Sequence, residues 1–83
     1  MSEYDIAIRD ANKISSKANE LREKRRQLNN LLNIVGTSYS GTDAEAYKNA
    51  VMKAQQELYD ISISLDNIAA DVRTEAEAIR NEE

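Results

Sequence analysis

The chain has 83 residues, with 11 lysines and arginines against 15 aspartates and glutamates, a net charge of −4, and neither cysteine nor histidine. Without these two residues there are no disulfides and no thiolates, and the commonest general base and metal ligand are missing, so we expect neither an enzyme nor a cofactor. A chain this short gains only roughly 3 to 5 kcal/mol from its own core, which favours a protein partner. Proline is absent and glycine occurs twice, so little interrupts helix formation and we predict an all-α fold.

Charge is unevenly distributed along the chain. Residues 1–35 carry seven basic and five acidic side chains, whereas residues 43–83 carry four basic and ten acidic ones. This opposite bias suits segments that lie against each other, and it argues against nucleic acid as the partner. No apolar run approaches the roughly 18 to 20 residues of a membrane span, and the N-terminus lacks the features of a signal peptide. We therefore expect synthesis as a cytoplasmic chain without a membrane span.

The first predicted element is a helix over residues 2–35. Ser2 has the right side chain for an N-cap, and Asp5 places an acid in the first turn. Apolar residues at heptad spacing form one stripe, which Arg25 interrupts. Arg25 would either extend along the helix to water or pair across the hairpin with an acid such as Glu57. The stripe comprises Tyr4, Ala7, Ala11, Ile14, Ala18, Leu21, Leu28, Leu32 and Val35.

A loop over residues 36–41 and a second helix over residues 42–81 follow. Gly36 comes directly after the first stripe, where we expect a left-handed C-cap because glycine carries no Cβ. Thr42 and Glu45 have the spacing of a capping box, which marks the start of the second helix. The second stripe again repeats every seven residues. It comprises Ala44, Tyr47, Val51, Ala54, Leu58, Ile61, Leu65, Ile68, Val72 and Ile79.

These boundaries predict an antiparallel two-helix hairpin, forming a single domain over residues 1–83. A short loop would place Tyr4 near Val72, and Ile14 near Ile61 and Ile63. The same geometry leaves residues 77–83 extending past the N-terminus, if both helices rise about 1.5 Å per residue. Such an overhang would meet only solvent or a partner.

More apolar residues are present than one seam can cover. A hairpin buries only one stripe per helix, so the remainder would pack on a second hairpin, giving a four-helix bundle as a homo- or heterodimer. The alternative is that these side chains are scattered in solvent, as on many protein surfaces. The predicted partner-binding residues are Ile8, Leu31, Tyr47, Tyr59, Ile63, Ala69 and Ala76.

Two charged clusters are interpreted as solvated surface. The basic cluster in the first helix is flanked by acids, which is typical of an exposed helix face rather than of an RNA or lipid site. The acidic C-terminal end lacks oxygens that converge on one point, so no metal site is expected there. The two clusters are Arg22, Lys24, Arg25 and Arg26, and Glu75, Glu77, Glu82 and Glu83.

The loop sequence is Tyr39-Ser40-Gly41, followed by Ala44 and Tyr47 at helical spacing. This pattern resembles the Trp-x-Gly loop of the WXG family, the small ESAT-like helical hairpins of bacterial type VII secretion. Tyr39 stands where that family usually has Trp, whereas Gly41 and the following helix start fit the pattern. The resemblance covers nearly the whole chain. Tyr39 would either cover the open end of the hairpin or take part in recognition.

The export signal of the resembled family is an aromatic residue followed four positions later by an acid, near the end of the second helix. The nearest match here pairs Ile79 with Glu83 and lacks the ring. The resemblance therefore implies a targeting or chaperone-like partner that binds a larger exported protein, such as an LXG toxin, and either stays in the cytoplasm or is secreted with that protein. The alternatives are a secreted substrate dimer and a structural coiled-coil adaptor with no link to secretion.

Overall fold

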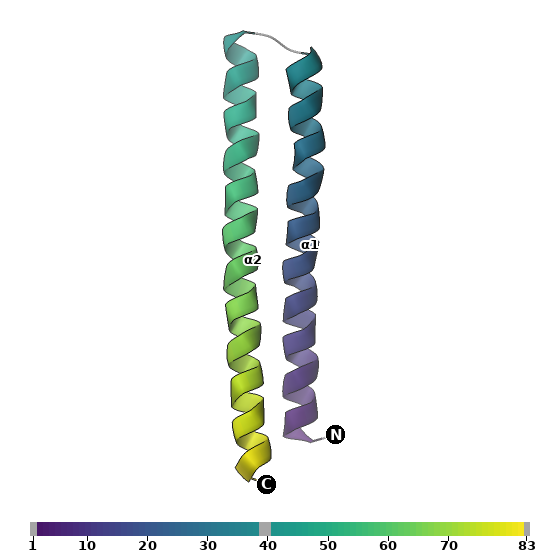
Figure 1. Cartoon of the computed structure of the whole chain (residues 1–83), viewed down its shortest axis with the longest axis vertical. Coiled ribbons are helices and arrows are strands. Elements are labelled where there is room, and N and C mark those ends of the chain that lie inside the picture. The colour runs from purple at the N-terminus through teal and green to yellow at the C-terminus, as the bar shows by residue number, and fades with distance from the viewer. Residues whose placement is uncertain (1, 39–40, 83) are drawn as a thin grey trace.

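The chain forms a hairpin of two long helices, α1 (Glu3–Ser38) and α2 (Thr42–Glu82). The computed structural model describes residues 2–38 and 41–82, with the backbone alone for Thr37 and Ser38. The helices run antiparallel and side by side, so both chain ends lie at the same end of a body of 64 × 16 × 10 Å (Figure 1). Neither helix is long and apolar enough to span a membrane. The predicted all-α hairpin is confirmed.

The start of α1 has the predicted N-cap. The Ser2 hydroxyl oxygen accepts a hydrogen bond from the Asp5 amide at 3.1 Å. The Ser2 carbonyl accepts a second one from the Ile6 amide at 3.1 Å. Glu3 and Asp5 in the first turn also complement the positive end of the helix dipole. The helix therefore begins almost at the terminus because its first amides have acceptors.

The two glycines have roles different from those expected. α1 continues through Gly36 to Ser38, so the prediction that Gly36 ends the helix in a left-handed cap is wrong. Glycine costs a helix only about 1 kcal/mol relative to alanine, which the burial of Val35 beside it can offset. Of the described residues only Gly41 has a positive φ, 87°. Its carbonyl accepts a hydrogen bond from the Glu45 amide at 3.3 Å, so this left-handed residue directly precedes α2 and is bonded to its first turn.

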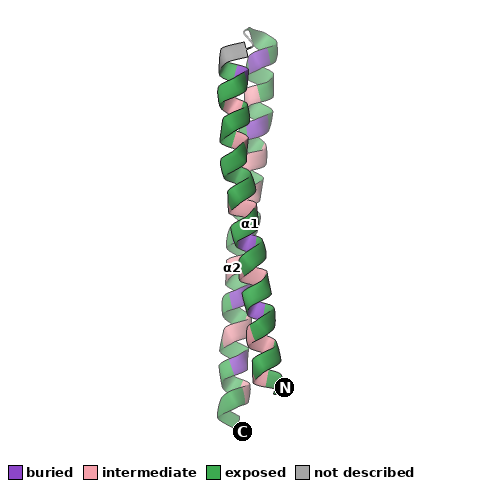
Figure 2. Cartoon of the chain, turned by 90° about the vertical axis from the view of Figure 1, so that its right-hand side faces the viewer, coloured by how far each residue is buried: buried purple, intermediate pink, exposed green. Residues whose placement is uncertain are grey.

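The seam between the helices follows the predicted stripe along α1. Ala11 and Ala18 are fully buried, and Val35 is 3% exposed. The remaining stripe residues are half-buried, as expected where one helix covers only part of another (Figure 2). They are Tyr4, Ala7, Ile14, Leu21, Leu28 and Leu32.

In α2 half of the predicted stripe is wrong. The series that starts at Ala44 and repeats every seven residues is buried or half-buried, as expected. In the series that starts at Tyr47, Ala54 is half-buried, but Tyr47, Ile61 and Ile68 are 51%, 50% and 48% exposed. Residues four positions after the first series replace them in the seam. These residues are Ser62, Ala69 and Ala76, each 0% exposed.

Side-chain size explains this exchange of positions. Helices approach each other most closely where the residues between them are small, and an isoleucine at the same place would hold them apart. Ala69 and Ala76, expected on the outer surface, are instead fully buried in the seam, as are Ala11 and Ala18 of α1. The buried Ser62 hydroxyl donates a hydrogen bond to the Tyr59 carbonyl at 2.7 Å, so its polar atom is satisfied.

The register of the hairpin differs from the prediction by roughly two helical turns. The Tyr4 hydroxyl donates a hydrogen bond to Glu77 Oε1 at 3.1 Å, and the Arg80 guanidinium lies 5.2 Å from the centre of the Tyr4 ring. The expected neighbour was Val72. The predicted overhang of residues 77–83 is therefore wrong for Glu77 and Arg80, which contact Tyr4. The end of α2 still extends a short way past the start of α1, because α2 is the longer helix (Figure 1).

Candidate protein-binding surface

Long polar side chains join the two helices along one broad side of the hairpin. Arg22 donates two hydrogen bonds to Asp66, from Nη1 to Oδ2 at 2.9 Å and from Nη2 to Oδ1 at 3.3 Å. Arg73 Nη2 donates to Asn12 Oδ1 at 3.2 Å and to Ser15 Oγ at 3.0 Å. We call this side the polar face. Its contacts fix which flank of α1 lies beside which flank of α2.

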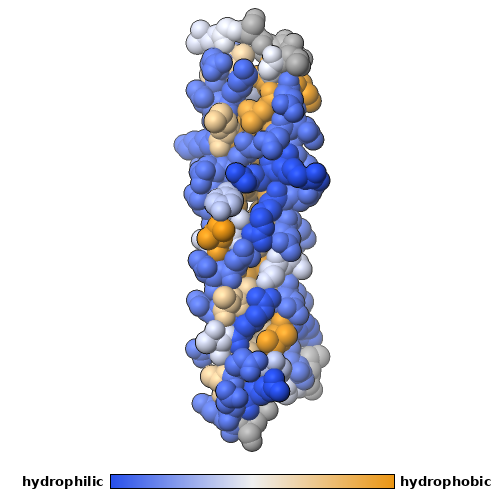
Figure 3. Space-filling view, viewed as in Figure 1, coloured by the Kyte–Doolittle hydropathy of each residue, from blue (hydrophilic) through white to orange (hydrophobic). Residues whose placement is uncertain are grey.

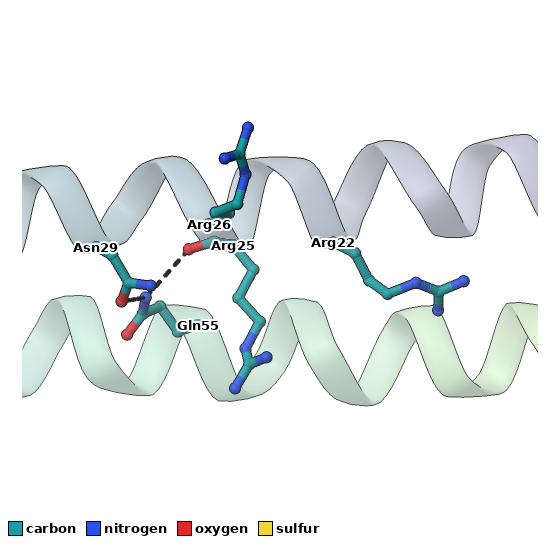
Figure 4. Close-up of a pocket in the computed structure, with 5 residues that line it drawn as sticks. All are labelled: Arg22, Arg25, Arg26, Asn29 and Gln55. Atoms are coloured by element: carbon teal, nitrogen blue, oxygen red, sulfur yellow. Dashed lines mark hydrogen bonds between the residues drawn. The ribbon is translucent and has the colours of Figure 1, made fainter.

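Arg25 lies on the same face and is exposed, as in the predicted arrangement that extends to water, and it does not pair with Glu57. Its guanidinium stacks over the Tyr59 ring at 4.9 Å from the centroid, so it reaches across the hairpin to an aromatic ring rather than to Glu57. Beside it, Gln55 Nε2 donates to the Arg25 carbonyl at 3.1 Å and to Asn29 Oδ1 at 2.7 Å (Figure 4). Arg25 thus contributes to the contact between the helices through both its side chain and its backbone.

Arg26 is paired along α1 instead of across the hairpin. Its Nη2 and Nε donate to the two carboxylate oxygens of Glu23 at 2.6 and 3.1 Å. These hydrogen bonds are the main reason that the pKa of Glu23 lies below its ordinary value, and the charge of Arg26 lowers it further. The same contact raises the pKa of Arg26. Two of the three arginines in the basic cluster therefore have a carboxylate partner within the chain.

The opposite side of the hairpin carries large apolar side chains. On α2, Tyr47, Ile61 and Ile68 lie on the flank that faces away from Tyr59 and Asp66, across the buried seam. On α1, Leu31 lies on the corresponding flank and is 40% exposed. We call the surface formed by Leu31, Tyr47, Ile61 and Ile68 the apolar face. The half-buried residues Ile14, Leu21 and Leu28 lie between its two edges.

The view of Figure 3 looks onto the polar face. In Figure 1 α1 rises on the right, so in a right-handed helix the residues four positions after the seam turn toward the viewer. Hydrophilic atoms cover most of this side, and hydrophobic side chains form separate patches along it (Figure 3). The polar face is therefore suited to remain in water, and the apolar face is the better candidate for a protein interface.

The structure divides the predicted partner-binding residues among three environments. Leu31 and Tyr47 lie on the apolar face. Ile8, Tyr59 and Ile63 lie on the flanks that form the polar face. The other two, Ala69 and Ala76, are buried in the seam, so they are removed from the outer surface.

The residues taken from the secretion resemblance lie at the two ends of the hairpin. Gly41 has the left-handed conformation described above. Ile79 is half-buried in the last turns of α2. Tyr39 and Glu83 lie outside the described residues.

Ile61 and Ile68 are the surface residues that sequence reasoning missed. Both fit a heptad stripe, so the spacing alone assigned them to the seam. The available signal was size, because alanines recur every seven residues in α1 and small residues recur at 62, 69 and 76 in α2. A seam of small residues on both helices leaves the isoleucines outside it.

Comparison with known proteins adds a family match. A family model described as proteins of 100 residues with WXG matches residues 4–83. The match spans both helices and the segment between them, so it rests on the whole hairpin and not on the loop tripeptide alone. No curated protein and no solved structure matches the chain significantly.

Proposed function

The chain belongs to the WXG100 family of small helical proteins associated with type VII secretion, and we propose that it binds a larger exported protein and helps to target it to the secretion machinery. Members of this family are non-enzymatic and typically dimeric. The proposed partner is another helical protein, and the product of binding is a four-helix bundle. In this role the hairpin leaves the cell together with its client.

The observation that carries this proposal is the apolar face. Four large side chains there are between 40% and 51% exposed, namely Leu31, Tyr47, Ile61 and Ile68. Fully burying a large apolar side chain is worth about 1.5 to 3 kcal/mol, so covering this face adds several kcal/mol to a hairpin with a small core. A pair of helices laid along the face would cover both of its edges and the half-buried residues between them.

The end of α2 favours a client-dependent role over autonomous export. Ile79 occupies the position where the family's export signal has an aromatic residue, and its side chain is half-buried against the hairpin. A larger partner would have to supply the missing recognition element. The alternative within the family is a secreted substrate dimer, in which two copies cover each other's apolar faces and are exported without a client.

Recovery of the chain from its native cell tests the proposal. A tagged copy is purified under native conditions, and the proteins recovered with it are identified by mass spectrometry. We expect a larger protein with a helical N-terminal domain in stoichiometric amount. Recovery of the chain with itself alone, together with its accumulation outside the cell in the absence of any client, would instead support the substrate dimer.

A second experiment separates both secretion roles from a structural adaptor. Tyr39→Ala removes the aromatic residue of the loop, and Ser40→Ala is the matched control at the neighbouring position. If the loop takes part in recognition, Tyr39→Ala reduces client recovery and export whereas Ser40→Ala does not, and circular dichroism shows both variants to be helical. Unchanged client recovery and export in both variants would favour the adaptor.

A further inference from the structure

A hollow of about 320 Å³ opens between the helices on the polar face. Its walls are the side chains of Arg22, Arg25, Arg26, Asn29 and Gln55. Figure 4 shows the Arg25 side chain crossing toward α2, the Arg26 side chain directed away from α2, and the two amides facing each other beside them. The hollow is thus lined by three arginines and two residues with carboxamide side chains, with the Arg26 guanidinium turned outward.

The three arginines differ in how their charge is compensated. Arg22 is held by the Asp66 carboxylate at 2.9 Å, and Arg26 by the Glu23 carboxylate at 2.6 Å. Within residues 2–38 and 41–82, Arg25 forms no ion pair, and its guanidinium contacts the face of Tyr59. The hollow therefore carries about one uncompensated positive charge, located at Arg25.

We infer that this hollow binds a carboxylate of an acidic protein segment, with Arg25 as the principal contact. The Arg25 guanidinium carbon lies over the Tyr59 ring, 4.9 Å from its centroid, and a contact with a ring face does not use the N–H groups at the edge of a guanidinium as donors. A carboxylate matches this edge, because its two oxygens can accept two parallel N–H bonds. The Asn29 side-chain NH2 borders the same space and can donate to a bound carboxylate, whereas both hydrogens of Gln55 Nε2 are already donated to the Arg25 carbonyl and to Asn29 Oδ1.

The surrounding charges favour a single carboxylate over a polyanion. Glu23 and Asp66 lie at the edge of the hollow, and the whole chain has a net charge of −4. An RNA or an anionic membrane would bring many charges against these acids, whereas one glutamate or aspartate side chain needs only Arg25. The site lies opposite the apolar face, so the inference does not depend on the proposed targeting role.

Nuclear magnetic resonance of the full chain, labelled with ¹⁵N, tests the site. The probe is a short peptide of glycine and serine with one central glutamate and blocked ends, added at low salt while the side-chain signals of the arginines, Asn29 and Gln55 are followed. We expect saturable shifts at Arg25 Nε–H and at the Asn29 side-chain amide. Arg25→Gln should weaken binding by roughly tenfold, since it removes the charge and both donors of the fork.

Arg9→Gln is the matched control, because it removes the same group from the same helix about 24 Å away along the axis. Its binding should stay within a factor of about two of the unsubstituted chain. Arg25→Lys keeps the charge without the planar fork and should bind with intermediate strength. Thermal melts followed by circular dichroism establish that each variant is folded before binding is compared.

Three results would overturn the inference. The first is an absence of saturable shifts at the hollow. The second is an equal loss of binding in Arg9→Gln, which would show diffuse attraction to the whole helix. The third is displacement of the glutamate peptide from the Arg25 signals by an equimolar oligouridine, which would identify a site for polyanions.

Discussion

At the scale of single residues, the size of the seam side chains decides which side of α2 faces α1. Ala69 is fully buried, whereas the adjacent Ala70 is exposed. Both positions carry the same side chain on the same helix, but only Ala69 is covered by α1. A difference between the same substitution at the two positions therefore reports the contact with α1. This pair allows a direct test of the seam.

We predict that Ala69→Leu destabilises the hairpin by about 1 to 3 kcal/mol, because a leucine in the close contact forces the helices apart. Ala70→Leu, the matched control, should change the free energy of unfolding by less than about 0.5 kcal/mol. Urea denaturation at one fixed protein concentration measures both values, since self-association would otherwise alter the apparent stability. Equal effects of the two substitutions would contradict the assigned seam.

The pair of Glu23 and Arg26 gives a prediction about pH. Hydrogen bonds from Arg26 lower the pKa of Glu23 in the folded chain. The folded state therefore binds fewer protons there than the unfolded state, and the pair's contribution is present above the ordinary pKa of glutamate and lost as pH falls through the lowered value. A ¹³C titration should find the pKa of Glu23 below that of an exposed glutamate, and Arg26→Gln should bring it back. A pKa unaffected by that substitution would rule out the contact.

The limits of sequence reasoning are visible at these residues. The α1 stripe was predicted correctly because only one set of apolar residues repeats along that helix. In α2 the isoleucines and the alanines both repeat every seven residues, and hydrophobicity ranks Ile61 and Ile68 above Ala69 and Ala76. Close packing reverses this order. The cross-hairpin partners of Arg25 and Tyr4 were also missed. They depend on how the two helices are aligned along their axes, and heptad spacing alone is compatible with several alignments that differ by whole turns.

At the scale of the helices, the sequence predicted the number, type and approximate ends of the elements. Heptad spacing and the Ser2 cap were sufficient for the body of the helices and the start of α1. The end of α1 was placed three residues too early, since a glycine stops a helix only where the packing does not continue past it.

The two glycines should respond in opposite directions to the same substitution. Gly36 lies inside α1, and nothing lies within 4 Å of the place that a Cβ would occupy there, so Gly36→Ala should stabilise the chain by about 0.5 to 1 kcal/mol. Gly41 has a φ of 87°, so Gly41→Ala should destabilise it by about 1 kcal/mol or more. Thermal melts of both variants check the prediction. Stabilisation by both substitutions would show that Gly41 does not need its left-handed conformation.

At the scale of the whole molecule, the hairpin is long and thin. Its radius of gyration is 18.8 Å, whereas a compact domain of this length has about 12 Å. Such a shape leaves most side chains at the surface, and the fully buried ones are all small. One seam therefore provides a limited core, and the apolar face offers the additional burial that a partner would supply.

The most direct test of this account replaces one exposed apolar side chain on each side of α2. Ile61 is 50% exposed on the apolar face, and Met52 is 57% exposed on the flank that bears Tyr59. Substitution of either residue by lysine adds one positive charge to α2. Because both side chains are about half exposed, the hairpin itself should tolerate either substitution. The measurement is the amount of partner protein recovered with each tagged variant from the native cell. We predict that Ile61→Lys loses most of the partner, because a charge would be buried in the interface, and that Met52→Lys retains it. Equal recovery with both variants, or loss with Met52→Lys alone, would contradict binding through the apolar face.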